Sequence, residues 1–322
     1  MKDRTVLAYR IQDERPEPDD FYREVITGLN RNPKQIAPKF FYDKAGSRLF
    51  EHICKQPEYY PTRVETGILG QYAEEIAGLA GKDGCLIEPG SGSCSKVRLL
   101  LDALRPSRYI PMDISCSHLH EAAERVAADF PWLDVHAVCA DITRSVELPG
   151  IPEQAQRVVF YPGSSIGNYE PREAVEFLCK LAGLSGPGGG LLIGVDLQKE
   201  SAILDDAYND ANGITAEFNL NLLHRINREL DADIDIDTFR HHAFYNETEG
   251  RVEMHLVSEY SQTLRIDGHS YEFTAGESIH TENSYKYTTE GFRALAKQAG
   301  FTAEAIWMDE EELFSLHFLR AA

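Results

Sequence analysis

The feature that most constrains the fold is a series of short apolar segments between residues 85 and 196, separated by longer helical patterns. Apolar runs occur at 85–87, 109–112, 133–138, 157–161 and 191–195, with helical spacing of apolar residues at 96–104, 118–130 and 173–184. Such alternation is typical of a parallel sheet covered by helices. We therefore expect an α/β domain in this part of the chain.

The segment that follows residue 198 has a different character. It opens with helical patterns and continues with 251–260 and 262–273, which we interpret as paired antiparallel strands with the tight turn at Asp267–Gly268. A last helix at 289–299 and two strands at 303–307 and 313–319 would return to the edge of the parallel sheet.

These patterns predict a division of the chain into domains. The predicted parts are an α/β core of residues 63–198 and 286–322, a smaller α+β domain of residues 20–62 and 199–285, and an N-terminal lead-in of residues 1–19.

Composition excludes several classes of partner. The chain has 52 Asp and Glu against 32 Lys and Arg, a formal charge of −20, and no basic stripe that would attract a phosphate backbone. No apolar run reaches membrane-spanning length, and the N-terminus lacks a secretory pattern. We expect a cytoplasmic protein that acts as a monomer on a small molecule, without nucleic acid or membrane as a partner.

Cysteines and histidines give no metal-binding pattern. The six cysteines lack a C-x-x-C pair, so we expect reduced, mostly buried thiols. Among the eleven histidines only His241 and His242 are adjacent, and adjacent side chains point in different directions. The sequence therefore predicts no metal site.

Polar residues follow the first three strands of the predicted sheet. The turn Glu88–Ser93 contains Gly90 and Gly92, which allow the backbone to approach a ligand closely, but it lacks the third glycine of the dinucleotide fingerprint. Asp113 after the second strand is placed to accept hydrogen bonds from ribose hydroxyls, and Asp141 after the third to accept one from an adenine amino group.

This order of features resembles class I S-adenosylmethionine-dependent methyltransferases, which have a Rossmann-like core. In that class the glycine turn passes the methionine part of the donor and the second-strand acid binds its ribose. The donor carries no phosphate, which agrees with the lack of a phosphate-binding lysine motif.

Further motifs narrow the resemblance. The sequence is similar, from about Pro33 to its C-terminus, to the histidine Nα-methyltransferases of ergothioneine biosynthesis. The motifs that carry the resemblance are Lys39–Asp43, Pro57–Glu65, Gly163–Asn168, Ala207–Asp210 and Thr281–Ser284.

The resemblance implies a role for each matching residue. The donor would be held by Gly90, Lys96, Asp113, Asp141 and Ile142. The amino and carboxylate groups of the substrate would be surrounded by Tyr59, Gly163, Asn168 and Tyr208, and Glu282 and Ser284 would bind its imidazole. Pro89 departs from the family pattern and removes one backbone donor from the cofactor turn.

The chemistry of these side chains agrees with an amino-acid substrate. A carboxylate such as Glu282 accepts a hydrogen bond from one imidazole nitrogen, and the Ser284 hydroxyl adapts to the other. Methyl transfer needs in-line alignment and loss of the ammonium proton, which Tyr42, Tyr59 or water would relay. We expect Nα-methylation of L-histidine, carried to the trimethylated betaine hercynine, without a metal.

Two other functions remain open from the sequence. A relative of this family would methylate another amino-acid-derived amine, such as a tryptophan derivative. A protein of a different class would bind S-adenosylmethionine without catalysis and act as a sensor.

Overall fold

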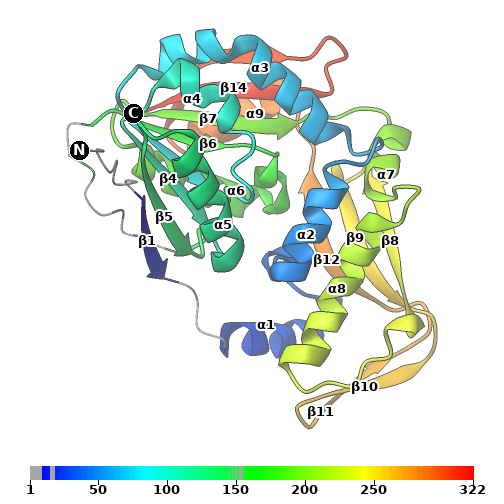
Figure 1. Cartoon of the computed structure of the whole chain (residues 1–322). Helices are drawn as coiled ribbons and strands as arrows, with labels where there is room; N and C mark the ends of the chain where they lie inside the picture. The colour runs from blue at the N-terminus through cyan, green and yellow to red at the C-terminus, as the bar shows by residue number, and fades with distance from the viewer. Residues whose placement is uncertain (1–8, 15–18, 145, 147, 149–150, 152–154) are drawn as a thin grey trace. The chain divides into compact units, whose positions relative to one another are not determined.

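The computed structural model describes residues 9–14, 19–144, 146, 148, 151 and 155–322, and the chain divides into two compact units. Unit 1 comprises the strand β1 (Tyr9–Glu14) and the described residues of Pro61–Gln198 and Tyr287–Ala322. Unit 2 comprises the described residues of Glu17–Tyr60 together with Lys199–Lys286. Each unit has a sheet and helices of its own (Figure 1).

Within the described residues, eight strands of unit 1 form one sheet in the order β1-β5-β4-β3-β6-β7-β14-β13. Neighbours from β1 to β7 are parallel, whereas β14 is antiparallel to both β7 and β13. The further bounds are β3 (Cys85–Pro89), β4 (Arg108–Asp113), β5 (Asp134–Ala140), β6 (Arg157–Tyr161), β7 (Gly190–Asp196), β13 (Phe301–Met308) and β14 (Phe314–Ala321). The predicted α/β, Rossmann-like class is confirmed.

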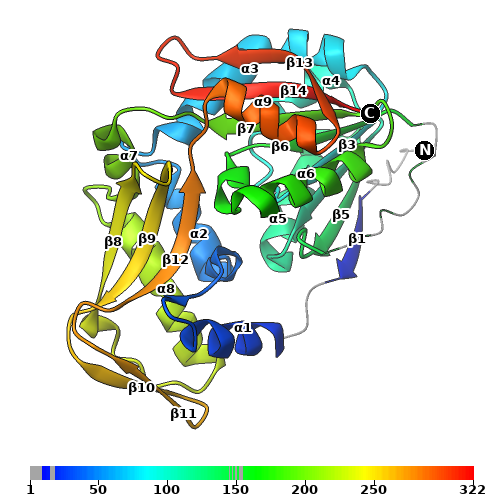
Figure 2. The same cartoon turned by 180° about the vertical axis from the view of Figure 1, so that it is seen from behind.

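Helices cover both faces of this sheet (Figure 2). One face packs against α3 (Tyr60–Ala80), α4 (Arg98–Leu104) and α5 (Cys116–Asp129), and the other against α6 (Pro171–Ser185) and α9 (Thr289–Gln298). Both faces need cover because both carry apolar side chains. Leu86 and Ile87 are successive residues of β3 that point to opposite faces, and each is buried in a different apolar cluster. Strands buried on both sides therefore appear in the sequence as continuous apolar runs.

The N-terminal strand differs from the expected lead-in. Residues 9–14 pair in parallel with β5 and form the edge of the sheet. Period-2 alternation is weak in this segment, because four of its six residues are exposed, so the sequence pattern gave little sign of a strand. Residues 1–8 and 15–18 of the predicted lead-in lie outside the described residues.

Unit 2 contains a second sheet in the order β2-β12-β9-β8. Its strands are β2 (Lys34–Gln35), β8 (Phe239–Asn246), β9 (Arg251–Ser258) and β12 (Ser278–Tyr285). Its helices are α1 (Asp19–Leu29), α2 (Lys44–Ile53), α7 (Ser201–Tyr208) and α8 (Ile214–Glu229). Helix α8 packs against both β8 and β9, and we call the side of the sheet that α8 covers its inner face.

The predicted pairing of 251–260 with 262–273 is wrong. The strand β9 pairs with β8 and β12, whereas β10 (Gln262–Ile266) and β11 (His269–Phe273) form a separate hairpin within the second segment. Asp267 and Gly268 have φ values of 45° and 76°, as a tight type I′ hairpin turn requires. The predicted position of the turn is confirmed, but the strands that it joins are β10 and β11, both within 262–273.

A β-bulge interrupts β12. His280 lies opposite His255 of β9, but Glu282 lies opposite Met254, so Thr281 is an additional residue in the ladder. Regular alternation would place residues 280 and 282 on one face of the sheet. With the bulge, Glu282 and Ser284 instead share a face with Met254 and Val252, the residues opposite them.

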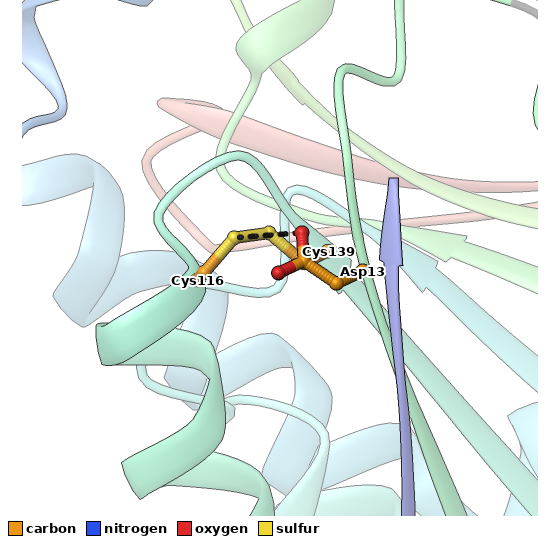
Figure 3. Close-up of side chains that lie close together, drawn as sticks. All are labelled: Asp13, Cys116 and Cys139. Atoms are coloured by element: carbon orange, nitrogen blue, oxygen red, sulfur yellow. Dashed lines mark hydrogen bonds between the residues drawn. A yellow bond between two sulfur atoms is a disulfide. The ribbon is translucent and has the colours of Figure 1, made fainter. Parts of the chain in front are cut away.

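The expectation of reduced cysteines is wrong for one pair. Cys116, at the start of α5, forms a disulfide with Cys139 of β5, and their Cα atoms are 5.2 Å apart (Figure 3). The carboxylate of Asp13 lies beside this disulfide, 3.9 Å from Cys116 Sγ. Cys85 and Cys94 are free and buried, as expected. The two partners are distant in sequence, so their spacing gave no signal.

Among the described residues, no helix combines the length and the apolar composition that crossing a bilayer would require.

Candidate active site

Three predicted cofactor residues, Gly90, Asp113 and Asp141, and one predicted substrate residue, Gly163, lie along one edge of the unit 1 sheet. Gly90 follows β3, Asp113 ends β4, Asp141 follows β5 and Gly163 follows β6. Strand order reverses between β3 and β6, and in open α/β sheets the ligand crevice lies beyond the carboxyl ends of the strands at such a reversal. The topology therefore brings these residues to the edge where a ligand is expected.

The glycine turn after β3 depends on backbone conformations that favour glycine. Gly90 and Gly92 have φ values of 69° and 51°. The amide of Gly92 donates to Asp113 Oδ2 at 2.9 Å, and the amide of Ser115 donates to the other oxygen, Oδ1, at 2.9 Å. Ile142 lies against Gly90, because a Cβ on Gly90 would be 3.9 Å from Ile142 Cδ1.

Asp113 and Asp141 are both held in fixed orientations. Burial raises the pKa of Asp113 above its ordinary value, although backbone donors oppose that change. Asp141 is buried and accepts hydrogen bonds from the amide and the hydroxyl of Thr143, at 2.9 and 2.5 Å. The structure thus presents one acid at the end of β4 and another directly after β5.

Lys96 contacts a buried acid, Glu65, to which the sequence assigned no role of its own. Its ammonium pairs with Glu65, whose side chain is fully buried on α3. Glu65 also accepts from the amide of Gly163, at 2.9 and 3.0 Å to its two oxygens. A Cβ on Gly194 would be 2.0 Å from Glu65 Oε1, so this position has no room for a side chain. Glu65 therefore joins α3, β6 and β7.

A second buried carboxylate lies at the end of β3. Glu88 is 1% exposed and accepts a hydrogen bond from the Tyr109 hydroxyl. Burial raises the pKa of Glu88 to about 8, and nearby Glu65 and Asp113 contribute in the same direction, whereas Lys96 opposes it. Glu88 therefore lies near two further carboxyl groups, those of Glu65 and Asp113, and near the ammonium of Lys96.

In unit 2, the structure brings together four residues predicted to bind substrate. Tyr208 donates from its hydroxyl to Ser284 Oγ at 2.8 Å, and the rings of Tyr59 and Tyr208 are 6.3 Å apart and edge-on. Burial raises the pKa of Tyr59 well above its ordinary value, with smaller contributions from Tyr208, Tyr42 and Glu282. Tyr59 is therefore a neutral phenol near pH 7.

Lys286 is a further member of this group that the sequence reasoning missed. Its side chain is buried, and its ammonium donates to Ser284 Oγ at 2.8 Å and to the Tyr208 hydroxyl at 3.4 Å. The ammonium also lies 5.1 Å from the centre of the Tyr208 ring. A signal was available: Lys286 follows Ser284 by two residues, which places both side chains on the same face of an extended strand.

The surroundings of Glu282 change the pKa of its carboxyl group. Burial raises its pKa to about 7, and the charge of Lys286 partly offsets this effect. The carboxyl group is therefore only partly ionised near neutral pH.

Tyr42 belongs to an aromatic cluster in unit 2. Its ring contacts Phe50 and Phe218, with centroids 5.7 and 5.6 Å away, and Phe50 in turn contacts Tyr59 at 6.3 Å. Gly163 and Asn168, which the sequence also assigned to the substrate, belong to unit 1, where η2 (Ser165–Asn168) follows β6.

Comparison with known families identifies the chain. Residues 21–321 match the model of the histidine-specific, S-adenosylmethionine-dependent methyltransferases. The chain belongs to this family. It is 42% identical over 300 residues to a histidine N-alpha-methyltransferase of Mycolicibacterium smegmatis, covering 91% of this chain and 92% of that one. It is also 30% identical over 317 residues to ergothioneine biosynthesis protein 1 of Neurospora crassa, covering 91% of this chain and 34% of that one.

A solved structure supports the fold. An S-adenosylmethionine-dependent methyltransferase from Clostridium acetobutylicum matches with a TM-score of 0.50 and 11% identity, covering 85% of this chain and 98% of that one. The chain is therefore an S-adenosylmethionine-dependent methyltransferase by both family and fold.

The residues at the edge of the unit 1 sheet fit this donor. S-adenosylmethionine carries a sulfonium and an ammonium against one carboxylate, and the carboxyl group of Asp113 lies at this edge, near that of Glu88. The Asp113 carboxylate is positioned by the amides of Gly92 and Ser115, and retains acceptor capacity for a ribose hydroxyl. Gly90, Gly92 and Ile142 provide a turn that backbone and apolar groups of a ligand can approach.

Proposed function

We propose that this methyltransferase transfers methyl groups from S-adenosylmethionine to the α-amine of L-histidine. The observation that carries the proposal is the placement of Glu282 and Ser284 on one face of β12, beside Tyr208 and Lys286. Unit 1 would bind the donor through the residues at its sheet edge, and the inner face of unit 2 would bind the imidazole.

The hydroxyl network gives Ser284 a defined role. Its oxygen accepts from both Lys286 and Tyr208, so its own proton is left to donate to a ligand. Glu282 would accept from the opposite side. A neutral imidazole offers one N–H and one unprotonated ring nitrogen, which complements this donor and acceptor.

The same network disfavours other aromatic amino acids. The indole of tryptophan has a single ring N–H and no second ring nitrogen, so it would leave the Ser284 donor without a partner. A buried polar group left unpaired costs about 1–3 kcal/mol, which corresponds to a selectivity of roughly tenfold to a hundredfold. This difference favours histidine over the tryptophan-derived alternative.

When bound, S-adenosylmethionine supplies an electrophilic methyl group on its sulfonium. The neutral α-amine attacks that carbon in line with the C–S bond, which breaks with its electrons remaining on sulfur. Because Tyr59 stays protonated, we assign it to orienting the amine and not to acting as a phenolate base. Water would take the ammonium proton, with Tyr42 as its relay.

We further propose three successive transfers, to the trimethylated betaine hercynine of the ergothioneine route. The aromatic cluster around Tyr42, Tyr59 and Phe218 supports this step, since aromatic faces attract quaternary ammonium ions. Gly163 and Asn168 are assigned to the amino-acid carboxylate. The absence of a metal from the reaction, the monomeric state and the cytoplasmic location stay predictions.

The test is a competition among equal concentrations of histidine, tryptophan and tyrosine with isotopically labelled methyl donor, read by mass spectrometry. We expect labelled product from histidine to exceed that from either competitor by roughly tenfold or more, with one, two and three methyl groups appearing in succession. Product from tryptophan in preference would refute the substrate assignment. Binding of the donor without product from any amine would favour the non-catalytic sensor.

A further inference from the structure

A row of histidines crosses the sheet of unit 2 on the face opposite α8. His242 of β8, His255 of β9 and His280 of β12 are directly opposite one another in the strand register. His241, one residue earlier, points to the inner face, where it bonds Asn219 of α8. Because side chains alternate between faces, the histidine row lies on the other side, which we call the outer face.

Glu253 completes a compact group with two of these histidines. It precedes His255 by two residues on β9, so both side chains lie on the outer face, and Glu253 Oε2 is 3.0 Å from His255 Nε2. One ligand atom from each of Glu253, His255 and His280 lies within 4.8 Å of the others. The side chains of Glu253 and His255 are only 9% and 15% exposed.

Hydrogen bonds orient the two imidazole rings. His255 Nδ1 is 3.2 Å from Ser278 Oγ, and His280 Nε2 donates to the backbone carbonyl of Glu282 at 3.0 Å. One nitrogen of each ring is therefore held by an oxygen outside the group, while His255 Nε2 faces Glu253 and the second nitrogen of His280 is Nδ1. Metal-binding histidines show this arrangement, in which the second nitrogen fixes the tautomer and the direction of the ring.

The second oxygen of Glu253 is held by other residues. Glu253 Oε1 accepts hydrogen bonds from Asn246 at 3.0 Å and from Arg251 at 2.9 Å, so Oε2 is the oxygen that faces His255.

We propose that Glu253, His255 and His280 bind a divalent transition-metal ion of the zinc class. Two imidazoles and one carboxylate are a known ligand set for Zn²⁺, with water completing four-coordination. Bonds of about 2.0–2.2 Å at tetrahedral angles separate two ligand atoms by about 3.3 Å, close to the 3.0 Å between His255 Nε2 and Glu253 Oε2. The ion lies between these two atoms, and the neutral His255 ring carries its proton on Nδ1, which donates to Ser278 Oγ.

A metal ion at this position would link two strands of the unit 2 sheet. The ion cross-links β9 and β12 directly beside the bulge, and His280 holds the carbonyl of Glu282. Metal binding therefore stabilises unit 2 and the strand that carries Glu282. The sequence gave no sign of this site, because its ligands come from two strands and pair only across the sheet.

The experiment uses the full-length protein after removal of metals by a chelator, with no histidine present, so its result is independent of the proposed substrate. Equilibrium dialysis against Zn²⁺ and metal analysis should give one ion per chain, and Zn²⁺ should raise the melting temperature. His280→Ala and Glu253→Gln should each lower the affinity by at least about tenfold. His242→Ala, in the same row but outside the ligand group, should bind like the unaltered protein.

Co²⁺ provides a second readout, because its visible absorption reports direct coordination by imidazole. Unaltered protein that takes up no Zn²⁺ would overturn the proposal, as would equal uptake by the His255→Ala/His280→Ala double variant. Circular dichroism of each variant checks folding. If the double variant is unfolded, the His280→Ala and Glu253→Gln single variants decide the question.

Discussion

Replacing Glu282 by Gln tests the role of this carboxyl group without changing its shape. Its pKa of about 7 lies well above the ordinary value of 4.5. At about 1.4 kcal/mol per pH unit, ionisation of Glu282 in the folded protein costs up to about 3 kcal/mol. Because the Glu282 side chain is partly exposed to solvent, about half of that is a better value. A ring N–H donated by histidine would offset this cost, so the benefit of Glu282 should depend on pH.

The expected change in kinetics follows from the two protonation states. Above pH 7 the carboxylate accepts a charge-assisted hydrogen bond of about 1.5–3 kcal/mol, whereas the amide oxygen of Gln accepts a neutral one of about 1 kcal/mol. The kcat/KM for histidine should therefore fall about tenfold in Glu282→Gln near pH 8. Near pH 5.5 the carboxyl group is mostly protonated, and the two proteins should differ by about twofold or less.

The assay is kcat/KM for histidine measured from about pH 5.5 to about pH 9 in both proteins. The ratio of the two profiles removes the ionisations of free histidine, which both proteins share. This ratio should rise with pH and show an inflection near the pKa of Glu282. A ratio that stays constant across this range would refute the assignment of the imidazole contact to an ionised Glu282.

Measurements of the free energy of unfolding serve as the control. Glu282 should favour histidine turnover as pH rises, but it should lower the stability of the folded protein over the same range. A carboxyl group with a raised pKa in the folded state favours folding below its unfolded pKa and loses that contribution as pH rises through about 7. The stability of Glu282→Gln relative to the unaltered protein should therefore increase from pH 5 to pH 8. A variant that is unstable at every pH would show that the substitution damages the fold.

Two further substitutions test the lysines of the two units. Lys96→Met leaves the buried Glu65 without its cation, so the free energy of unfolding should fall by about 3–5 kcal/mol in denaturant titration; a change below about 1 kcal/mol would contradict the pairing. Lys286→Met removes a donor from Ser284 and the charge that lowers the pKa of Glu282. KM for histidine should therefore rise about tenfold, and the inflection in the pH profile of kcat/KM should move to higher pH. An inflection at the same pH in this variant would exclude the electrostatic role of Lys286.

The unit 1 sheet was predictable because its strands are buried on both faces. A strand such as β6 (Arg157–Tyr161) then appears as an uninterrupted apolar run, with the bounds expected from the sequence. The acids after these strands were found by the same reasoning, since parallel strands bring their carboxyl ends to one edge. By contrast, Glu65 contributes to that edge from a helix, and α3 has no strand end to mark it.

Contacts between distant segments account for most of what the sequence could not give. The Cys116–Cys139 disulfide and the approach of His280 to Glu253 and His255 each join side chains that meet only across neighbouring elements. Local periodicity carries no information on such pairs, because it reports which face a residue occupies and not which residue faces it.

Glu282 shows this limit most clearly. Glu282 and Ser284 are two residues apart, and both lie on the inner face of the sheet. His280 and Glu282 are also two residues apart, but His280 lies on the outer face. The difference is the bulge at Thr281, whose hydroxyl donates to Asn219 Oδ1 at 2.8 Å and is 3.0 Å from the carbonyl of Met254. Asn219 lies 62 residues earlier, on α8. The orientation of Glu282 therefore depends on a helix distant in sequence, and a pattern read along β12 alone would give the wrong face for either His280 or Glu282.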